Sequence, residues 1–341
     1  MKKRKKLVVL FLGIIMFFGV IVHRESTKTQ KKAEKEYLQI VTLNYKNGEN
    51  DKDGILLDLY EYSVSDSKMT EVVELPVNST YPVAYYDHTR EKVFFSDDPN
   101  GYNYDNLYEY DFKTDTVKQV TFGENIFNDM FAVQDKLYLN VAPIYSTVTK
   151  PAIFDMDTYE ITYLDEKDDD TWYTSLSYNS STNSLLTVIN SDNEMRTDWV
   201  RGVTHIRPKS IVSFLPDFKN IKTLYHTEDY EIRLARQLDD KHILLTYDAS
   251  MMSMEPRRLK ILDVESKEVS DYDIPGIYEV YSFYPRDNGK GIFVLGSDSN
   301  KIFDLYYYDI QNSSIENVFH PGNLPPSHRN TLDFIYYIES E

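Results

Sequence analysis

A strand–turn–strand unit recurs six times in this sequence, helical periodicity after residue 37 never persists beyond about ten residues, and each chain end holds only part of the unit. These three observations predict an all-β fold: a six-bladed β-propeller of four-stranded antiparallel blades. We expect pairing of the two chain ends to close the ring. One N-terminal hydrophobic helix is expected to precede it.

The repeat is clearest at residues 105–122, DNLYEYDFKTDTVKQVTF, where a strand, an Asp-led turn and a second strand follow one another. The residues that open the six turns are Ser63, Asp111, Asp155, Asp217, Asp263 and Asp309. Their spacings of 48, 44, 62, 46 and 46 residues match the ~40–50 residues of a propeller blade, and the longest marks an insertion. We expect each aspartate to cap the backbone of its own turn.

Two earlier strands complete the blades, and the chain ends complete the ring. The expected pairs are 81–87 with 91–96, 231–238 with 242–248, and 278–284 with 291–297. Residues 37–45 begin a blade without an innermost strand, and residues 331–338 are typical of such a strand. Pairing these two segments leaves no long open sheet edge.

The pattern LYEYD-x4-T-x-K-Q-V-T at residues 107–121 resembles the repeats of TolB-like six-bladed β-propellers. Propeller domains of prolyl oligopeptidase-type peptidases share this fold. The resemblance extends over residues 37–341 as a blade pattern. It implies protein or ligand binding on a propeller face, often outside the cytoplasmic membrane, and it assigns no functional residue to this chain.

Charge divides the chain near residue 36. Residues 1–36 carry ten Lys or Arg and three Asp or Glu, a balance of +7, whereas residues 37–341 carry 27 and 52, a balance of −25. Residues 1–6 form a basic n-region, and the apolar run 7–22 would span about 24 Å as a helix. Without a small-residue cleavage pattern after the run, we expect an uncleaved transmembrane signal anchor with a cytoplasmic N-terminus. A cleaved signal would instead secrete the protein.

Residues 23–36 are polar and lack aromatic side chains, so we expect a tether between the anchor and a propeller domain at 37–341. The absence of cysteine excludes disulfides, thiolate metal sites and cysteine nucleophiles. The net charge of −18 argues against a nucleic-acid partner. We find no G-x-S-x-G, H-E-x-x-H, phosphate-loop or dinucleotide motif, and therefore assign no catalytic residue. Whether the protein is an enzyme stays open, with a non-enzymatic role favoured.

The long connections between second and third strands are expected on one face, where insertions of repeat proteins collect binding residues. The richest is 190–206, and loop 96–106 adds aromatic side chains. The candidate binding residues are Arg196, Asp198, Trp199, Arg201, His205, Tyr102 and Tyr104. An exposed Trp beside Arg is typical of a binding hot spot. The alternative is an insertion that folds onto its own blade and buries Trp199.

Two acidic segments could attract cations. Loop 96–106 presents candidate Ca²⁺ ligands at Asp97, Asp98, Asn100, Asn103 and Asp105. The stretch DPNG within it is also an ordinary turn sequence, so Ca²⁺ is the one cofactor considered and none is otherwise expected. The run DEKDDD at 165–170 is either a solvated charge cluster or an attractor of a cationic partner.

The sequence therefore predicts a membrane-anchored extracytoplasmic propeller. It would bind a protein, peptide or glycan, neutral or cationic, through its loop-rich face. One alternative is a glycan-active hydrolase or lyase, which would need two carboxylates about 5–9.5 Å apart at the mouth of the central channel. The other is a structural or sensor subunit of a membrane complex.

Overall fold

The computed structural model describes residues 34–46, 54–79, 81–100, 104–144, 146–194, 209–248, 255–286, 289–300, 303–320 and 328–340. Tyr37–Tyr337 form one compact unit, and Met1–Glu36 with Ile338–Glu341 form a second. The predicted anchor at 7–22 lies outside the described residues, as does most of the predicted tether. Within the described ranges no helix is long and apolar enough to cross a membrane.

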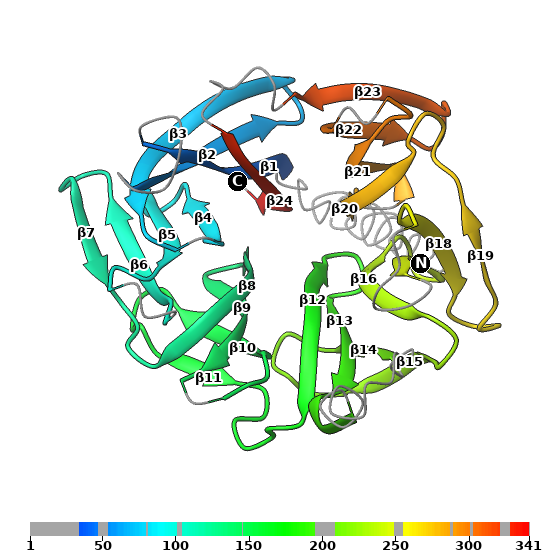
Figure 1. Ribbon diagram of the computed structural model, residues 1–341, viewed down its shortest axis with the longest axis horizontal. Coiled ribbons are helices and arrows are strands. Elements are labelled where there is room, and N and C mark those ends of the chain that lie inside the picture. Colours follow the sequence, from blue (N-terminus) through cyan, green and yellow to red (C-terminus); the bar gives the residue numbers. More distant parts are fainter. Residues whose placement is uncertain are drawn as a thin grey trace, which may run out of the picture. The chain divides into compact units, whose positions relative to one another are not determined.

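The unit Tyr37–Tyr337 is a six-bladed β-propeller of four-stranded sheets, which confirms the predicted fold (Figure 1). In the first blade the strand order is β24, β1, β2, β3, so the two ends of the chain pair as predicted. The strands of this blade are β24 (His328–Ser340), β1 (Glu34–Tyr45), β2 (Ile55–Ser63) and β3 (Lys68–Val77). β1 thus begins three residues inside the segment expected to be a tether.

The second, third and fourth blades follow along the chain. The second contains β4 (Ala84–Asp87), β5 (Lys92–Asp97), β6 (Asn106–Asp111) and β7 (Thr116–Gln119). The third contains β8 (Glu124–Val133), β9 (Lys136–Pro143), β10 (Lys150–Asp155) and β11 (Ile161–Tyr163). The fourth contains β12 (Thr171–Asn179), β13 (Ser184–Ser191), β14 (Lys209–Phe214) and β15 (Lys222–Thr227).

The fifth and sixth blades complete the ring. The fifth contains β16 (Glu231–Gln237), β17 (His242–Asp248), β18 (Arg258–Asp263) and β19 (Val269–Tyr272). The sixth contains β20 (Glu279–Pro285), β21 (Gly291–Ser297), β22 (Phe303–Asp309) and β23 (Ser314–Phe319). In Figure 1, strands β4, β8, β12, β16, β20 and β24 surround the axis of the ring, and the fourth strand of each blade lies at its perimeter. The predicted inner strands match these positions to within a few residues.

Aspartate side chains cap the outer hairpins, as the repeat predicts. Asp111 Oδ1 accepts the backbone N–H groups of Lys113 and Thr114 at 2.8 and 3.2 Å. Similar bonds are made by Asp155, Asp217, Asp263 and Asp309. The fourth residue after the turn opener has a positive φ in five blades, at Ser67, Asp115, Tyr159, Lys267 and Ser313. In these blades the third and fourth strands are therefore joined by the same kind of capped turn, which ends in a residue with a left-handed backbone conformation.

The buried apolar side chains of the described residues form six clusters, one between each pair of neighbouring blades. Alternate residues of a strand contribute to opposite neighbours, because successive side chains point to opposite faces of a sheet. In β1, Leu38 and Ile40 pack towards the sixth blade, and Val41 and Leu43 pack towards the second. Phe334 of β24, 1% exposed, joins the cluster that closes the ring.

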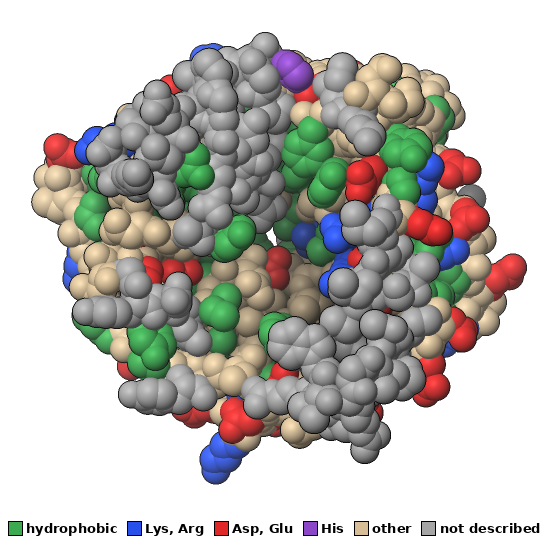
Figure 2. All heavy atoms as spheres, in the orientation of Figure 1, with side chains coloured by type: hydrophobic (Ala, Val, Ile, Leu, Met, Phe, Trp, Pro, Cys, Tyr) green, Lys and Arg blue, Asp and Glu red, His purple; other side chains and the backbone are tan. Residues whose placement is uncertain are grey.

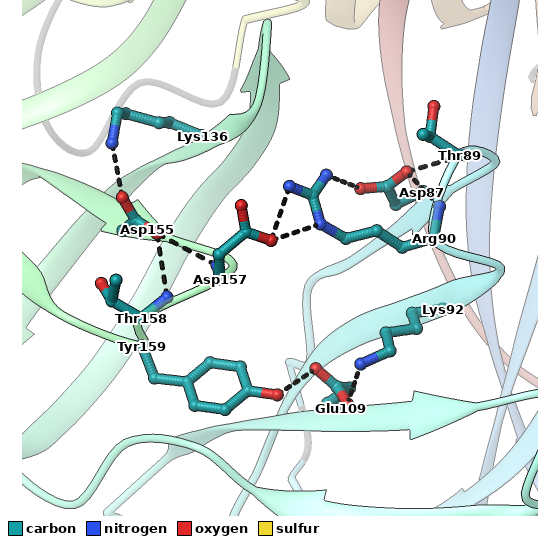
Figure 3. A network of polar contacts seen from close by, with 10 residues as sticks. All are labelled: Asp87, Thr89, Arg90, Lys92, Glu109, Lys136, Asp155, Asp157, Thr158 and Tyr159. Carbon is teal, nitrogen blue, oxygen red and sulfur yellow. Dashed lines mark hydrogen bonds and ion pairs between the residues drawn. The ribbon is translucent and has the colours of Figure 1, made fainter.

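Polar contacts also join the second blade to the third (Figure 3). Arg90, in the turn after β4, donates to Asp157, in the turn before β11, at 2.9 Å. Glu109 of β6 accepts a hydrogen bond from Lys92 of β5 at 2.6 Å and another from the Tyr159 hydroxyl of the third blade at 2.9 Å. Glu109 is 5% exposed, so its carboxylate depends on these donors in place of water.

Tyr159→Phe should lower the free energy of unfolding by about 1–2 kcal/mol, because it removes one of two donors from a buried carboxylate. Urea unfolding of the purified protein measures this change. The matched control is Tyr110→Phe, which removes an exposed hydroxyl bond to Asp115 within one blade and should cost less than about 0.5 kcal/mol. Equal losses of unfolding free energy in the two variants would show that the hydrogen bond between the blades stabilises the protein no more than an exposed hydrogen bond does.

Candidate functional site at the propeller axis

A cavity of about 600 Å³ lies at the centre of the propeller, and we call it the axial cavity. Its wall takes residues from the inner strands of all six blades and from β1. Figure 2 shows a hollow at the middle of the ring with basic side chains beside it. Polar and apolar groups share the wall, as is usual in ligand sites.

Register shifts in the inner strands determine which side chains reach this cavity. Four inner strands carry such a shift, at Phe127/Asp129, Thr174/Ser177, Ile232/Leu234 and Val280/Ser282. Arg233 and Arg236 stand three positions apart, so a regular strand would direct them to opposite faces. The bulge between Ile232 and Leu234 adds one residue on β16, and both arginines line the cavity.

Arg236 is the buried cation of the wall. Its side chain is 4% exposed, and its guanidinium carbon lies 3.5 Å from the centroid of the Tyr284 ring. Tyr284 in turn packs edge-on against Phe334 of β24 at 5.2 Å. Arg236 Nε and Nη1 are buried and have no hydrogen-bond partner among the described residues. The ring therefore holds the flat face of the guanidinium, while Nε and Nη1 have no acceptor among the described residues.

Asp129 of β8 is the one carboxylate among the described residues that line the cavity. Its Oδ2 accepts hydrogen bonds from Asn140 Nδ2 and from the backbone N–H of Leu176, both at 3.2 Å. Burial raises the pKa of Asp129, and the charge of Arg236 and the two hydrogen bonds offset only part of this rise. The described wall thus lacks the carboxylate pair that glycosidic chemistry requires.

A second basic group lies beside the first. Asp248, 6% exposed at the end of β17, accepts Arg233 Nε at 2.6 Å and Arg257 Nε at 3.1 Å. Glu279 is a further carboxylate of this region and accepts the hydroxyl of the wall residue Tyr281 at 3.2 Å. The described groups here thus include three guanidinium cations and three carboxylates, in a domain whose net charge is strongly negative.

The structure leaves the predicted binding loop untested. The connection from β13 to β14 contains the insertion that the repeat spacing indicated. The predicted residues Arg196, Asp198, Trp199, Arg201 and His205 lie outside the described residues, as do Tyr102 and Asn103. Tyr104 is described and is 43% exposed. The axial cavity is therefore a candidate site that the loop pattern of the sequence did not predict.

Two carboxylates of the acidic segment at the end of β5 and after it are bonded to residues that follow β3. Asp97 Oδ1 accepts the backbone N–H groups of Asn78 and Ser79 at 2.7 and 3.0 Å, and Asp105 Oδ2 accepts the Ser79 hydroxyl at 3.2 Å. Burial raises the pKa of Asp105 to about 6, and the charges of Asp98 and Asp97 add to this effect. Within the described ranges no group of three or more His, Asp or Glu is arranged to hold a metal ion.

The backbone of the DEKDDD run, residues 165–170, surrounds the amino group of a lysine from the third blade. Lys150, 1% exposed at the start of β10, donates from Nζ to the backbone carbonyls of Asp165, Glu166 and Asp168 at 2.9, 3.1 and 2.6 Å. The Asp170 carboxylate accepts the Ser191 hydroxyl at 2.9 Å. The run is therefore an ordered loop built around an internal lysine, which its charge pattern alone did not predict.

Sequence reasoning missed Arg236, Arg233 and Asp129 as a group. The available signal was the pair of arginines in EIRLARQ, residues 231–237, on a strand correctly placed next to the axis. If side chains alternated regularly along this strand, Arg233 and Arg236 would point to opposite sides of the blade. The bulge that brings both to the cavity cannot be recognised in the sequence.

Comparison with solved structures finds propellers at low sequence identity. The putative TolB from Agrobacterium tumefaciens is 10% identical over 91% of this chain and 99% of that chain, with a TM-score of 0.53. TolB from Acinetobacter baumannii is 13% identical over 82% of this chain and 63% of that chain, with a TM-score of 0.50. The propeller domain of the Trilobed protease from Pyrococcus furiosus is 15% identical over 82% and 79%, with a TM-score of 0.49.

The similarities to the two TolB structures confirm the TolB-like fold and concern the fold alone. No protein-family model and no curated protein sequence matches this chain. Functional conclusions therefore depend on the residues of this chain.

Asp105→Asn should stabilise the protein at pH 8 by on the order of 1 kcal/mol, a value reduced for partial solvent screening. In the folded protein Asp105 keeps its proton up to about pH 6, whereas an unfolded Asp loses it near pH 4. The stability contributed by this proton is complete below about pH 4 and is lost as the pH rises through about 6. The advantage of the variant should therefore disappear near pH 4 in urea unfolding experiments.

The control for this titration is Asp240→Asn, at an exposed position of the β16–β17 hairpin. This variant shows the effect of removing one carboxylate at an exposed position. A stability difference for Asp105→Asn that stays constant between pH 4 and pH 8 would contradict the assigned pKa.

Proposed function

We propose that this chain is a binding module, anchored outside the cytoplasmic membrane, that receives part of its ligand in the axial cavity. The observation that carries the proposal is the buried Arg236 guanidinium, whose Nε and Nη1 no described residue satisfies. A buried charged donor without an acceptor costs free energy, and an acceptor supplied by a ligand would remove that cost. The cavity volume of about 600 Å³ lies within the range of small-molecule sites.

The long connections support a second contact area at one end of the blades. The first-to-second and third-to-fourth connections have two to seven residues, whereas the second-to-third connections of the first, second, fourth and fifth blades have eight or more. A partner protein, peptide or glycan would contact these loops, including Arg196 and Trp199, while one of its groups enters the cavity. The acidic excess of the domain favours neutral or cationic surfaces on such a partner.

The N-terminal segment supports the proposed location. The basic residues 1–6, followed by the uncharged run 7–22, have the order of a signal anchor. The complete lack of cysteine is compatible with either side of the membrane, so the location depends on this segment.

The two alternatives receive less support. A glycan-active hydrolase or lyase would need a second carboxylate near Asp129, and the described wall supplies none. A purely structural subunit of a membrane complex would make no use of an unsatisfied arginine in a cavity. Its binding to the complex should therefore be indifferent to changes inside the cavity.

The lack of native cysteine makes the membrane orientation directly measurable. Asp240→Cys places a thiol at an exposed site of the propeller, and Lys3→Cys places one in the predicted cytoplasmic n-region. A membrane-impermeant maleimide added to intact cells should label Asp240→Cys, and should label Lys3→Cys only after lysis. Thr246→Cys, at a position that is 0% exposed, is the unreactive control. The reverse labelling pattern would refute the proposed location.

Filling the axial cavity should reduce partner capture. Ser282 lies on β20 in the cavity wall, and Ser282→Trp would occupy space there. In affinity purification of the full chain from its own membranes, this variant should lose at least about 90% of any captured partner, because buried overlap is not tolerated in a packed site.

Thr70→Trp, on the exposed edge strand β3, is the matched control and should capture the partner normally. Trp199→Ala combined with Arg196→Ala tests the loop in the same assay. Loss in the loop variant alone, with Ser282→Trp unaffected, would place the binding site on the loops and contradict a role for the cavity.

A further inference from the structure

Arg236 raises a problem of charge compensation inside the molecule. A guanidinium has five N–H donors in a planar fork and is always charged. At 4% exposure the side chain has little contact with solvent, and no described residue accepts a hydrogen bond from Nε or Nη1. The Tyr284 ring stabilises the charge through its face but accepts no in-plane hydrogen bond. The site is therefore complete only when an acceptor is added.

The surroundings determine the sign of that acceptor. Arg233 and Arg257 share the carboxylate of Asp248. Glu279, which accepts the hydroxyl of the wall residue Tyr281, is a second carboxylate near Arg257. Burial favours the protonated form of Asp129. Three guanidinium groups then face two ionised carboxylates, so this part of the cavity has a small positive excess although the domain as a whole is acidic.

The geometry of the donors favours a planar anionic group. A carboxylate bonds bidentately to one edge of a guanidinium, where Nη2 pairs with either Nε or Nη1. The rest of the wall includes Tyr281, Phe303 and Phe334, which offer apolar surface to whatever carries the anionic group.

We infer that the axial cavity binds a ligand through a carboxylate group on Arg236, with the apolar part of the ligand against the aromatic side of the wall. This inference rests on the proposed function, and it specifies the chemistry of the bound group. The acidic exterior of the domain would contact the body of a partner. The basic part of the cavity wall would bind one carboxylate.

The test uses hippurate, which joins a carboxylate to an aromatic ring, and its uncharged amide, hippuramide. Ligand-observed NMR titrations are made on the full chain in lipid nanodiscs, with Ser282→Trp in identical discs to subtract binding outside the cavity. Hippurate should bind at least about tenfold more tightly than hippuramide, the ratio expected for hydrogen bonds to a charged group.

Arg236→Met should abolish the preference for hippurate over hippuramide, and Arg236→Lys should keep a reduced preference, because lysine retains the charge without the fork. Arg233→Gln is the neighbouring control and should reduce the preference less than Arg236→Met. The comparison of probes on the unmodified protein needs no variant, so a folding failure of Arg236→Met does not affect it.

Two outcomes would overturn the inference: equal affinity for hippurate and hippuramide, or no hippurate binding that Ser282→Trp removes. The proposed function has a separate test in partner capture. If Ser282→Trp abolishes capture while the two probes bind alike, the cavity binds its ligand without a carboxylate contact. If the probes are discriminated but capture is unaffected, the carboxylate site exists and the proposed role of the cavity in partner binding is wrong.

Discussion

Each blade of this propeller has two apolar faces, and both must be covered. A two-layer sandwich covers one face of each sheet, whereas a closed ring covers both, because every blade has a neighbour on either side. The six apolar clusters, one at each blade interface, are the contacts that cover these faces. The pairing of β24 with β1 completes the sheet that would otherwise interrupt the ring, and Phe334 completes its interface with the sixth blade.

The same constraint creates the site. When six sheets converge on an axis, their inner strands cannot all pack against one another, and a space is left among them. Bulges in β8, β12, β16 and β20 then turn polar residues towards this space instead of into a blade interface. Arg236 is accommodated there because Tyr284, itself held by Phe334 of the closing strand, supports the guanidinium face. Closure of the ring and the geometry of the candidate site are thus physically linked.

Sequence reasoning predicted the repeat well, since the capped turns depend on local chemistry. Asp111, Asp155, Asp263 and Asp309 each bond to backbone groups two and three residues ahead, and such turns can be identified from neighbouring residues alone. The cavity could not be found this way. The side chains that line it are determined by register shifts, which reverse the orientation of every following side chain. They also come from strands of six blades that are far apart in sequence. Lys150 shows the same limit, because its partners are backbone carbonyls that have no sequence signature.

The closing pair also has a consequence for biosynthesis. β1 and β24 lie at 34–45 and 328–340, so the contact that completes the first blade joins segments separated by almost the whole propeller. While the chain is being made, β1 has an unpaired edge until β24 follows, and such an edge can pair with another nascent chain. High contact order makes this last step slow relative to the formation of single blades. The first blade therefore stays open to pairing with other chains until the ring closes.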